Sequence, residues 1–348
     1  MGERLLCTQE VSGSNPLFST ILLLRRLNIA PLSLNDGLNM EVCRSLEEIV
    51  SRRPSAVALG FFDGLHIGHQ TLIAQCVALA KGRGLSACVF TFSEHPKNVM
   101  GGKLSVPRLQ TEKEKLERLS AFGVDRVFDF DFADGFHAMS PESFAQSLLK
   151  EAFSAEAVFC GFNFRFGAEA SGNTEALREY GKKFGFETHV VDPVYVSGKL
   201  VSSSLIRHCV NSGEADAASM LLGRDYGLSG VVEKGKKLGR EFGFPTANIN
   251  PAEGMALPAY GVYVTATLAN GTLYPSVSNV GVNPTVSEGV PVRVETHLLE
   301  TDISLYGEEI TVFFKKMLRE ERRFENEKAL FAQIATDAES ARAFFASA

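Results

Sequence analysis

Short apolar runs recur at regular intervals between residues 55 and 191 of the chain. Their length, with polar or turn-forming residues on either side, is typical of strands buried in a sheet. These runs predict strands at residues 55–62, 85–92, 124–130, 157–160 and 187–191.

Helical patterns fill the intervals between these strands. Apolar spacing and helix-start chemistry predict helices at residues 66–81, closed by Gly82; from Thr111, with its capping-box partner Glu114, to near Gly123; from Ser140-Pro141; and at residues 174–184. Strands that alternate with helices predict an α/β fold with a doubly wound parallel sheet of the Rossmann type.

The pattern changes after about residue 225. Apolar and polar positions alternate over residues 262–268, and Asn270-Gly271 is a strong two-residue hairpin turn. Further strands at residues 292–298 and 310–314 have no long helix between them, which predicts an antiparallel β-barrel or sandwich. A terminal helix follows, and core packing explains its apolar stripe of Leu330, Ile334, Ala338, Ala341 and Phe345.

The 348 residues suit two domains, because single hydrophobic cores stop growing near 250–300 residues. We expect one domain over residues 40–225 and a second over residues 226–348. Residues 1–39 show no sustained periodicity, and we interpret them as a disordered or artefactual extension, such as one from an upstream start codon. A targeting leader is the alternative, but Glu3, Glu10 and Asp36 do not fit the acid-poor composition of a transit peptide.

Composition narrows the class of protein. The net charge of −6 argues against a nucleic-acid partner, which calls for a basic face. The apolar stretch at residues 18–24 is too short to span a membrane, so we expect no membrane partner. The six cysteines are scattered without a C-x-x-C pair, which favours a reducing, cytoplasmic location.

One segment, residues 60–69, joins the first predicted strand to the first predicted helix, and we call it the signature turn. A doubly wound sheet binds phosphates at this position, and His66 and His69 share one face of the opening helical turn. The turn resembles the H-x-G-H signature of the nucleotidylyltransferase superfamily. We predict His66 and His69 as catalytic residues, and the nucleotide-binding residues Gly60, Phe62, Asp63, Gly64 and Gly68.

Two further segments narrow the family. Residues 161–167 and residues 202–207, together with His95-Pro96, resemble the motifs of prokaryotic-type FAD synthetases, and the resemblance covers nearly all of residues 40–225. It implies an FMN adenylyltransferase in which Asn163 contacts the nucleotide. Arg207 would clamp the ATP phosphates together with Ser203 and Ser204. Ser204 stands where the family usually has threonine, a change that keeps the hydroxyl.

A glycine-spaced basic loop opens the second half. Residues 230–237 nearly spell a Walker A loop, but Lys237 stands where Ser or Thr must bind magnesium, so we reject that interpretation. With Pro-Thr-Ala-Asn at residues 245–248, the loop resembles the opening of riboflavin kinases. The ligand-binding residues implied are Gly230, Gly235, Lys236, Gly239, Arg240 and Pro245.

The hard oxygen ligands Thr246 and Asn248 suit Mg²⁺. The resemblance continues through the whole second half. Strand alternation places Glu295 on the polar face of its strand, and in riboflavin kinases this glutamate is the catalytic base. Arg319 matches the flavin-side segment of that family, where we expect it to support ligand binding.

Together the resemblances imply a bifunctional enzyme of FAD biosynthesis. Riboflavin and ATP would give FMN and ADP, and FMN and ATP would then give FAD and pyrophosphate. Mg²⁺ is the expected cofactor, and ATP, riboflavin and FMN are the small-molecule partners. The sequence leaves the oligomeric state open, from monomer to weak homo-oligomer.

Three other functions share parts of this pattern. The H-x-G-H signature also fits adenylyl or cytidylyl transfer to another acceptor, such as pantetheine phosphate, but the riboflavin-kinase-like half argues against this. A class I tRNA synthetase would need a Lys-Met-Ser-Lys-Ser segment, which is missing from the sequence. A catalytically silent flavin or nucleotide sensor would be expected to have lost site residues that this chain retains.

Overall fold

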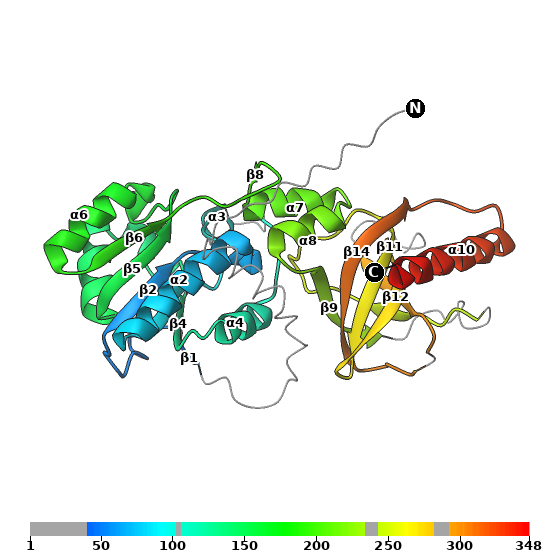
Figure 1. Cartoon of the computed structure of the whole chain (residues 1–348), viewed down its shortest axis with the longest axis horizontal. Coiled ribbons are helices and arrows are strands. Elements are labelled where there is room, and N and C mark those ends of the chain that lie inside the picture. The colour runs from blue at the N-terminus through cyan, green and yellow to red at the C-terminus, as the bar shows by residue number, and fades with distance from the viewer. Residues whose placement is uncertain (1–39, 102–105, 234–242, 282–291, 302, 348) are drawn as a thin grey trace, which may run out of the picture. The chain divides into compact units, whose positions relative to one another are not determined.

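The computed structural model describes residues 40–101, 106–233, 243–281, 292–301 and 303–347 (Figure 1). The expected extension at residues 1–39 lies outside these ranges.

The first part of the described chain is a six-stranded sheet in which all paired strands are parallel. The strand order is β1-β4-β3-β2-β5-β6. The strands are β1 (Glu41–Cys43), β2 (Ser55–Leu59), β3 (Ser86–Phe92), β4 (Arg126–Phe130), β5 (Ala155–Gly161) and β6 (Glu187–Val191). The doubly wound α/β fold predicted from the sequence is confirmed.

Helices cover both faces of this sheet. They are η1 (Asp63–Leu65), α2 (Ile67–Arg83), α3 (Pro96–Gly101), α4 (Glu112–Ala121), η2 (Phe136–Ala138), α5 (Pro141–Ser143), η3 (Phe144–Ala152), η4 (Ala168–Ala170) and α6 (Thr174–Phe184). The hairpin β7 (Tyr195–Val196) and β8 (Lys199–Leu200), α7 (Ser203–Asn211) and α8 (Ala215–Leu222) follow.

Side chains of β2 alternate between two cores. Ala56 and Ala58 pack with α2 on one face, whereas Val57 and Leu59 join a phenylalanine-rich core with η3 and α6 on the other. Small residues on the first face let α2 lie close to the strands. This packing sets the position of the first turn of α2.

The predicted boundaries on either side of the signature turn were wrong. The first strand ends at Leu59 rather than residue 62, because Phe62 has a left-handed backbone with φ 55°. The first helix continues to Arg83, and Gly84, not Gly82, is the left-handed residue that ends it. The capping box of Thr111 and Glu114 is confirmed.

The second half of the chain is a closed barrel with strand order β10-β13-β12-β11-β14-β9. Its strands are β9 (Tyr226–Glu233), β10 (Ala247–Ile249), β11 (Gly261–Ala269), β12 (Thr272–Gly281), β13 (Arg293–Leu298) and β14 (Glu309–Glu320). Neighbouring strands are antiparallel. Asn270 and Gly271 form the predicted hairpin turn with positive φ at both positions. The barrel, rather than a sandwich, is confirmed.

A hydroxyl network lies among the buried side chains of β11, β12 and β13. It links Thr265, Thr267, Ser276, Ser278 and Thr296 by hydrogen bonds at 2.7–3.2 Å. Each of these side chains is at most 1% exposed, so mutual bonding satisfies groups that water does not reach.

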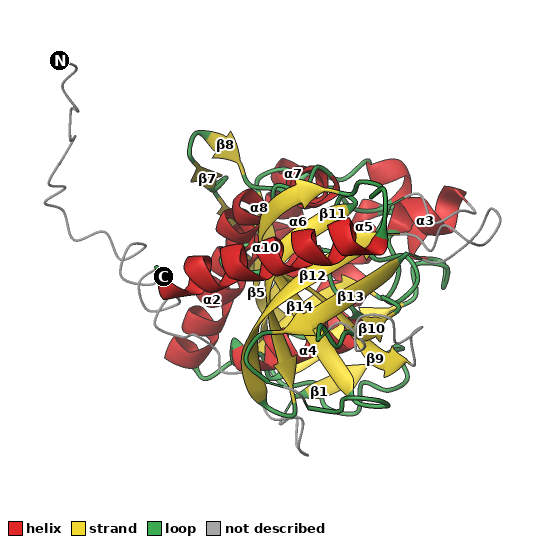
Figure 2. Cartoon of the chain, turned by 90° about the vertical axis from the view of Figure 1, so that its right-hand side faces the viewer, coloured by secondary structure: helices red, strands yellow, loops and turns green. Residues whose placement is uncertain are grey.

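The terminal helix α10 (Glu327–Ala346) lies across the outside of β11 and β12 (Figure 2). Ala338 and Ala341 of its apolar stripe are buried against Val262, Val264 and Val277. This confirms core packing for Ala338 and Ala341 and, as a partly buried neighbour, for Phe345.

Candidate functional site

The sheet order reverses between β2 and β5. From β2 the chain continues to β3 on one side, whereas β5 on the other side is followed by β6. In open α/β sheets ligands bind at such a point, beyond the carboxyl ends of the strands. The signature turn follows β2 and the Asn163 segment follows β5, so the fold brings these two predicted segments to one edge.

The backbone of the signature turn is left-handed at three residues. Phe62 and Leu65, with φ values of 55° and 40°, are strained there, whereas Gly64, with φ 76°, adopts this conformation without strain. A side chain at Gly64 would also bring a Cβ within 2.9 Å of Leu109 Cδ1. Such conformations persist where surrounding contacts hold them, and they are frequent at functional sites.

The two histidines of the turn stack against each other. His66 caps α2, with its Nδ1 accepting a hydrogen bond of 3.2 Å from the backbone N–H of His69. The two rings lie 3.6 Å apart, and Phe62 meets His69 edge-on at 5.2 Å. Because Nδ1 of His66 accepts, a neutral ring carries its proton on Nε2 and can donate it to a ligand.

Burial keeps these rings neutral. It lowers the pKa of His66 to about 4 and the pKa of His69 well below its usual value. Nδ1 of His69 is buried and has no hydrogen-bond partner among the described residues. An unpaired buried polar atom at the head of a helix fits a site where a ligand completes the bonding.

Asp63 of the signature turn forms a hydrogen-bond network with Arg207 and Ser203 of α7. The Asp63 carboxylate accepts from Arg207 Nη2 at 2.6 Å and from the Leu109 N–H at 2.9 Å. Burial raises the pKa of Asp63, although Arg207 acts in the opposite sense. Arg207 Nε also donates to Pro107 O, and Ser203 Oγ donates to Asp63 O. These contacts anchor the signature turn to α7.

The second predicted site lies on the outer side of the barrel. Glu295 pairs with Asn248 on β10 and with Asn279 on β12, and directly paired residues point to the same side of a sheet. The neighbours Val294 and Thr296 are fully buried on the opposite side. Asn248 is 6% exposed, and its Nδ2 lies 3.4 Å from Thr246 Oγ1. Glu295 therefore points outward from the barrel, away from the face of Val294.

His297 extends this outer face. Its ring lies 2.8 Å from Pro245 O and meets Phe244 edge-on. Burial lowers the pKa of His297. The ring therefore fixes the start of the Pro-Thr-Ala-Asn segment against β13.

Comparison with known proteins adds the family. Residues 48–205 match the family described as FAD synthetase, and residues 222–345 match riboflavin kinase. The bifunctional riboflavin kinase/FMN adenylyltransferase of Listeria monocytogenes is 34% identical over 83% of this chain and 92% of its own length. The Escherichia coli K12 enzyme of the same name shows the same identity and coverage.

The chain belongs to the family of bifunctional riboflavin kinases/FMN adenylyltransferases. This confirms the prediction of a bifunctional enzyme of FAD biosynthesis. A crystal structure of a Streptococcus pneumoniae chain called a macrolide-efflux protein is also similar, with a TM-score of 0.80 and 28% identity. The alignment covers 87% of this chain and 98% of that one. Among the described residues, no helix is long and apolar enough to cross a bilayer.

The remaining residues predicted to bind ligands differ in exposure and in how closely other atoms approach them. Asn163 and Ser204 are exposed, whereas a Cβ on Gly68 would lie 3.3 Å from the His66 ring. Gly60 is close to Phe62, and Gly230 approaches β10 so closely that a Cβ would lie 3.0 Å from Asn250 O. Gly235, Lys236, Gly239 and Arg240 lie outside the described residues.

Arg319 forms an ion pair with Asp337 of α10. Nε and Nη2 of Arg319 donate to the carboxylate at 3.0 and 2.8 Å, and Gln333 donates to it as well. Arg319 also lies against the ring of Phe324. These contacts fasten α10 to β14, and support of ligand binding by Arg319 stays a prediction.

Residues that no motif indicated hold the signature turn in place. Thr91, Gln70 and Gln110 each donate to a carbonyl oxygen of the turn. Apart from the closeness of Gln70 to His69, no spacing in the sequence points to them, because their contacts depend on the fold.

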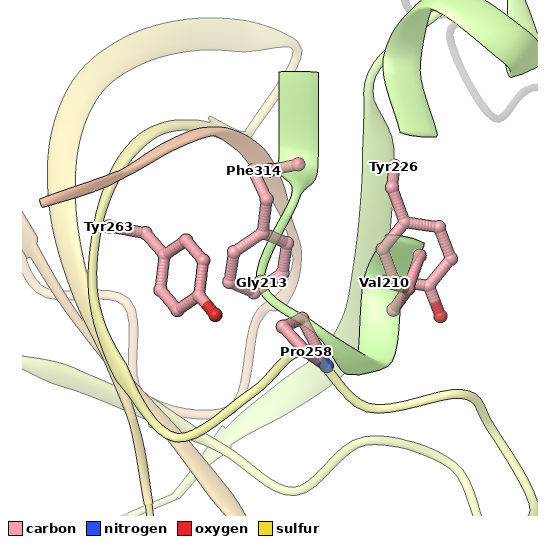
Figure 3. Close-up of a pocket in the computed structure, with 7 residues that line it drawn as sticks. Val210, Gly213, Tyr226, Pro258, Tyr263 and Phe314 are labelled. Carbon is pink, nitrogen blue, oxygen red and sulfur yellow. The ribbon is translucent and has the colours of Figure 1, made fainter. Parts of the chain in front are cut away.

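A small cavity of about 10 Å³, with room for one water, contains no residue of the signature turn in its lining (Figure 3). It is lined by Val210, Gly213, Ala215, Tyr226, Pro258, Tyr263 and Phe314.

Proposed function

We propose that the two reactions of this family take place at two separate sites of the chain. Riboflavin would be phosphorylated beside Glu295, and the resulting FMN would be adenylylated at the signature turn. The observation that carries this proposal is the placement of the two residue sets. The histidine pair lies at the end of a parallel sheet, whereas Glu295 lies on the outside of an antiparallel barrel. The corresponding domains are residues 40–225 and 226–348.

At the signature turn, an FMN phosphate oxygen attacks the α-phosphorus of ATP. The bond to the bridging oxygen breaks, and pyrophosphate leaves with the electron pair. No covalent enzyme intermediate is required, so the protein contributes alignment and stabilisation of charge. Nε2–H of neutral His66 is suited to donate to a phosphate oxygen. Asn163 and Ser204 would bind the rest of the nucleotide, and Arg207, which Asp63 and Pro107 O hold in place, would contact its phosphates from that position.

At the barrel, Glu295 accepts the proton of the ribityl 5′-hydroxyl of riboflavin. The oxygen attacks the γ-phosphorus of ATP, and ADP leaves. The side chains of Thr246 and Asn248 are neighbours, with Asn248 Nδ2 3.4 Å from Thr246 Oγ1. A hydroxyl oxygen and an amide oxygen are ligands that fit Mg²⁺. Bound there, Mg²⁺ would neutralise charge on the nucleotide phosphates.

A magnesium site at Thr246 and Asn248 needs few ligands from the protein. Within the described ranges no group of three His, Cys, Asp or Glu residues could hold a metal ion. Mg²⁺ at nucleotide sites takes most of its ligands from water and phosphate, so few protein ligands are needed.

A cytoplasmic location is part of the same proposal and is supported by the five described cysteines, which are all free.

His66→Ala and Glu295→Gln test the separation of the sites. Each variant is assayed twice, for FMN formation from riboflavin and for FAD formation from added FMN. We expect His66→Ala to lower the FAD rate about 100-fold or more and leave the FMN rate within about twofold, because only one site loses a donor to the phosphates. Glu295→Gln should do the reverse, since it removes the base of the other site.

Exposed residues provide the controls. His208→Ala and Glu320→Ala remove a histidine and a glutamate that are exposed in the structure. Both should keep the two rates. Parallel loss of both activities in His66→Ala or in Glu295→Gln would contradict separate sites.

A further inference from the structure

Half of the signature turn presents its carbonyl oxygens to protein side chains. Five consecutive oxygens, those of residues 61–65, accept hydrogen bonds at 2.7–2.9 Å from side chains of five different segments. In chain order, the donors are Thr91, Gln110, Ser203, Arg224 and Gln70. Because C=O and N–H of a trans peptide point in opposite directions, this arrangement turns N–H groups of the turn away from these donors.

Arg224 stands apart among these donors. It lies between α8 and β9, and its Nη2 donates to Gly64 O at 2.7 Å across 160 residues of sequence. Its Nη1 lies 3.4 Å from Leu65 O and 3.5 Å from Leu222 O. Residue 224 belongs to the range that matches riboflavin kinase, whereas the turn belongs to the range that matches FAD synthetase.

Gln70 strengthens the same connection. Its Nε2 donates to Leu65 O and to Leu222 O, both at 2.8 Å. Gln70 and Arg224 thus bridge the turn and the end of α8 by two independent side chains. The positive φ of Leu65 falls at the residue whose carbonyl both side chains approach. Strain at a non-glycine residue persists only where surrounding contacts hold it.

Burial dominates the surroundings of Arg224. It lowers the pKa of the guanidinium, as the charge of Arg118 also does, and the negative charges of Glu114 and Asp63 oppose this effect. Nε of Arg224 is buried and has no hydrogen-bond partner among the described residues. A guanidinium presents several donors in a rigid planar fork, which neither lysine nor methionine reproduces. Its charge also strengthens the bonds to the carbonyl oxygens.

We propose that Arg224 is a positioning residue for adenylyl transfer. It holds Gly64 O and Leu65 O, and so keeps the signature turn, including His66, in the conformation that meets the nucleotide. The proposal rests on the assignment of adenylyl transfer to the signature turn. It makes the first reaction site dependent on a residue at the start of the riboflavin-kinase match, whereas phosphorylation of riboflavin does not need Arg224.

The test compares Arg224→Met with Arg224→Lys in the full chain. With FMN and ATP supplied, Arg224→Met should lower kcat of FAD formation about 30- to 100-fold, because a shift of about 1 Å at a reacting centre has effects of this size. The KM values for ATP and FMN should change less than about threefold, since groups outside the turn remain to bind them. Arg224→Lys should recover part of kcat. Riboflavin phosphorylation by the same preparations should stay within about twofold.

Arg126→Met is the matched control. Arg126 is another buried arginine, which bonds to Glu41 and to Ser51 O at the edge of the sheet. We expect it to lower the melting temperature and keep both activities. If Arg224→Met does not fold, Gln70→Leu removes the second bridge and should show the same loss of kcat.

Several outcomes would overturn the proposal. Wild-type kcat of FAD formation in folded Arg224→Met, or in Gln70→Leu when Arg224→Met does not fold, would exclude positioning. Parallel loss of riboflavin phosphorylation would show general destabilisation. His66→Ala distinguishes failure of the positioning role of Arg224 from failure of the assignment of adenylyl transfer to the signature turn. If His66→Ala loses FAD formation and Arg224→Met does not, only the positioning role is wrong. If neither variant loses it, the signature turn is not the site.

Discussion

His66 and His69 show how the surroundings of a residue decide its chemistry. In water an imidazole changes charge near pH 6.5, but burial keeps both rings neutral well below that pH. As neutral groups they suit donation of a hydrogen bond to phosphate. A dependence on pH follows for stability.

Between pH 7 and pH 5 the unfolded chain should bind more protons at residue 66 than the folded chain. The folded-state pKa of His66 is about 4, so the ring stays neutral in the folded chain while it becomes protonated in the unfolded chain. Stability from this group is therefore fully present above about pH 6.5 and is lost as pH falls towards 4. We expect the free energy of unfolding to fall by about 2 kcal/mol between pH 7 and pH 5 from His66 alone.

Denaturant titrations at the two pH values measure this loss. His66→Gln should reduce the loss, whereas the exposed His208→Gln should leave the difference between the two pH values close to that of the wild type. An unchanged difference in His66→Gln would show that His66 does not carry the effect.

At the scale of elements, the end of α2 shows the limit of local pattern. Gly82 and Gly84 both follow the apolar stripe, and each has open space around the place of a Cβ. They differ in backbone, since Gly84 has φ 66° while Gly82 lies within the helix. Only the backbone conformation identifies the residue that ends the helix.

Alanine at these two glycines should therefore have opposite effects. Gly82→Ala should stabilise the protein by about 0.5–1 kcal/mol, because alanine favours a helix interior. Gly84→Ala should destabilise it by about 1 kcal/mol, because a Cβ disfavours the left-handed conformation. Thermal or denaturant unfolding measures both. The same sign for the two variants would contradict the observed helix end.

At the scale of the whole molecule, two unlike folds lie in one chain. The proposed site of the parallel sheet lies at strand ends, whereas Glu295 lies on the outer side of the barrel, because the barrel interior is filled. Direct contacts join the two parts, including the ion pair of Lys113 with Glu309 at 2.8 Å. The product of one proposed site is the substrate of the other, so we expect FMN to form before FAD.

Incubation with riboflavin, ATP and Mg²⁺ should show this order. FMN should rise first and then decline as FAD accumulates, when flavins are separated chromatographically over time. Removal of Mg²⁺ by a chelator should stop both steps, because the charges of ATP are then no longer neutralised, and added Mg²⁺ should restore them. FAD that forms without any FMN intermediate would contradict the proposed order.

Local regularity let the sequence determine most of the architecture. Helix starts at Thr111 and Ser140, the turn at Asn270-Gly271 and the alternation along β13 depend on neighbouring residues, so their patterns identify them. The motifs within residues 60–69, 161–167 and 245–248 likewise lie in short segments, so the order of residues along the chain is enough to indicate the family. The meeting of the first two motifs at one sheet edge follows from the predicted alternation of strands and helices.

Only the tertiary structure decided what holds the site in place. The stacking and burial of His66 and His69, the pairing of Asp63 with Arg207 and the bond from Arg224 to Gly64 require the folded chain. The bonds of Arg207 and Arg224 span 144 and 160 residues. Contacts of that span follow no periodicity, and an arginine in sequence is the same whether it binds ATP or a carbonyl oxygen. Folding selects between these roles by the groups that it places within hydrogen-bonding distance.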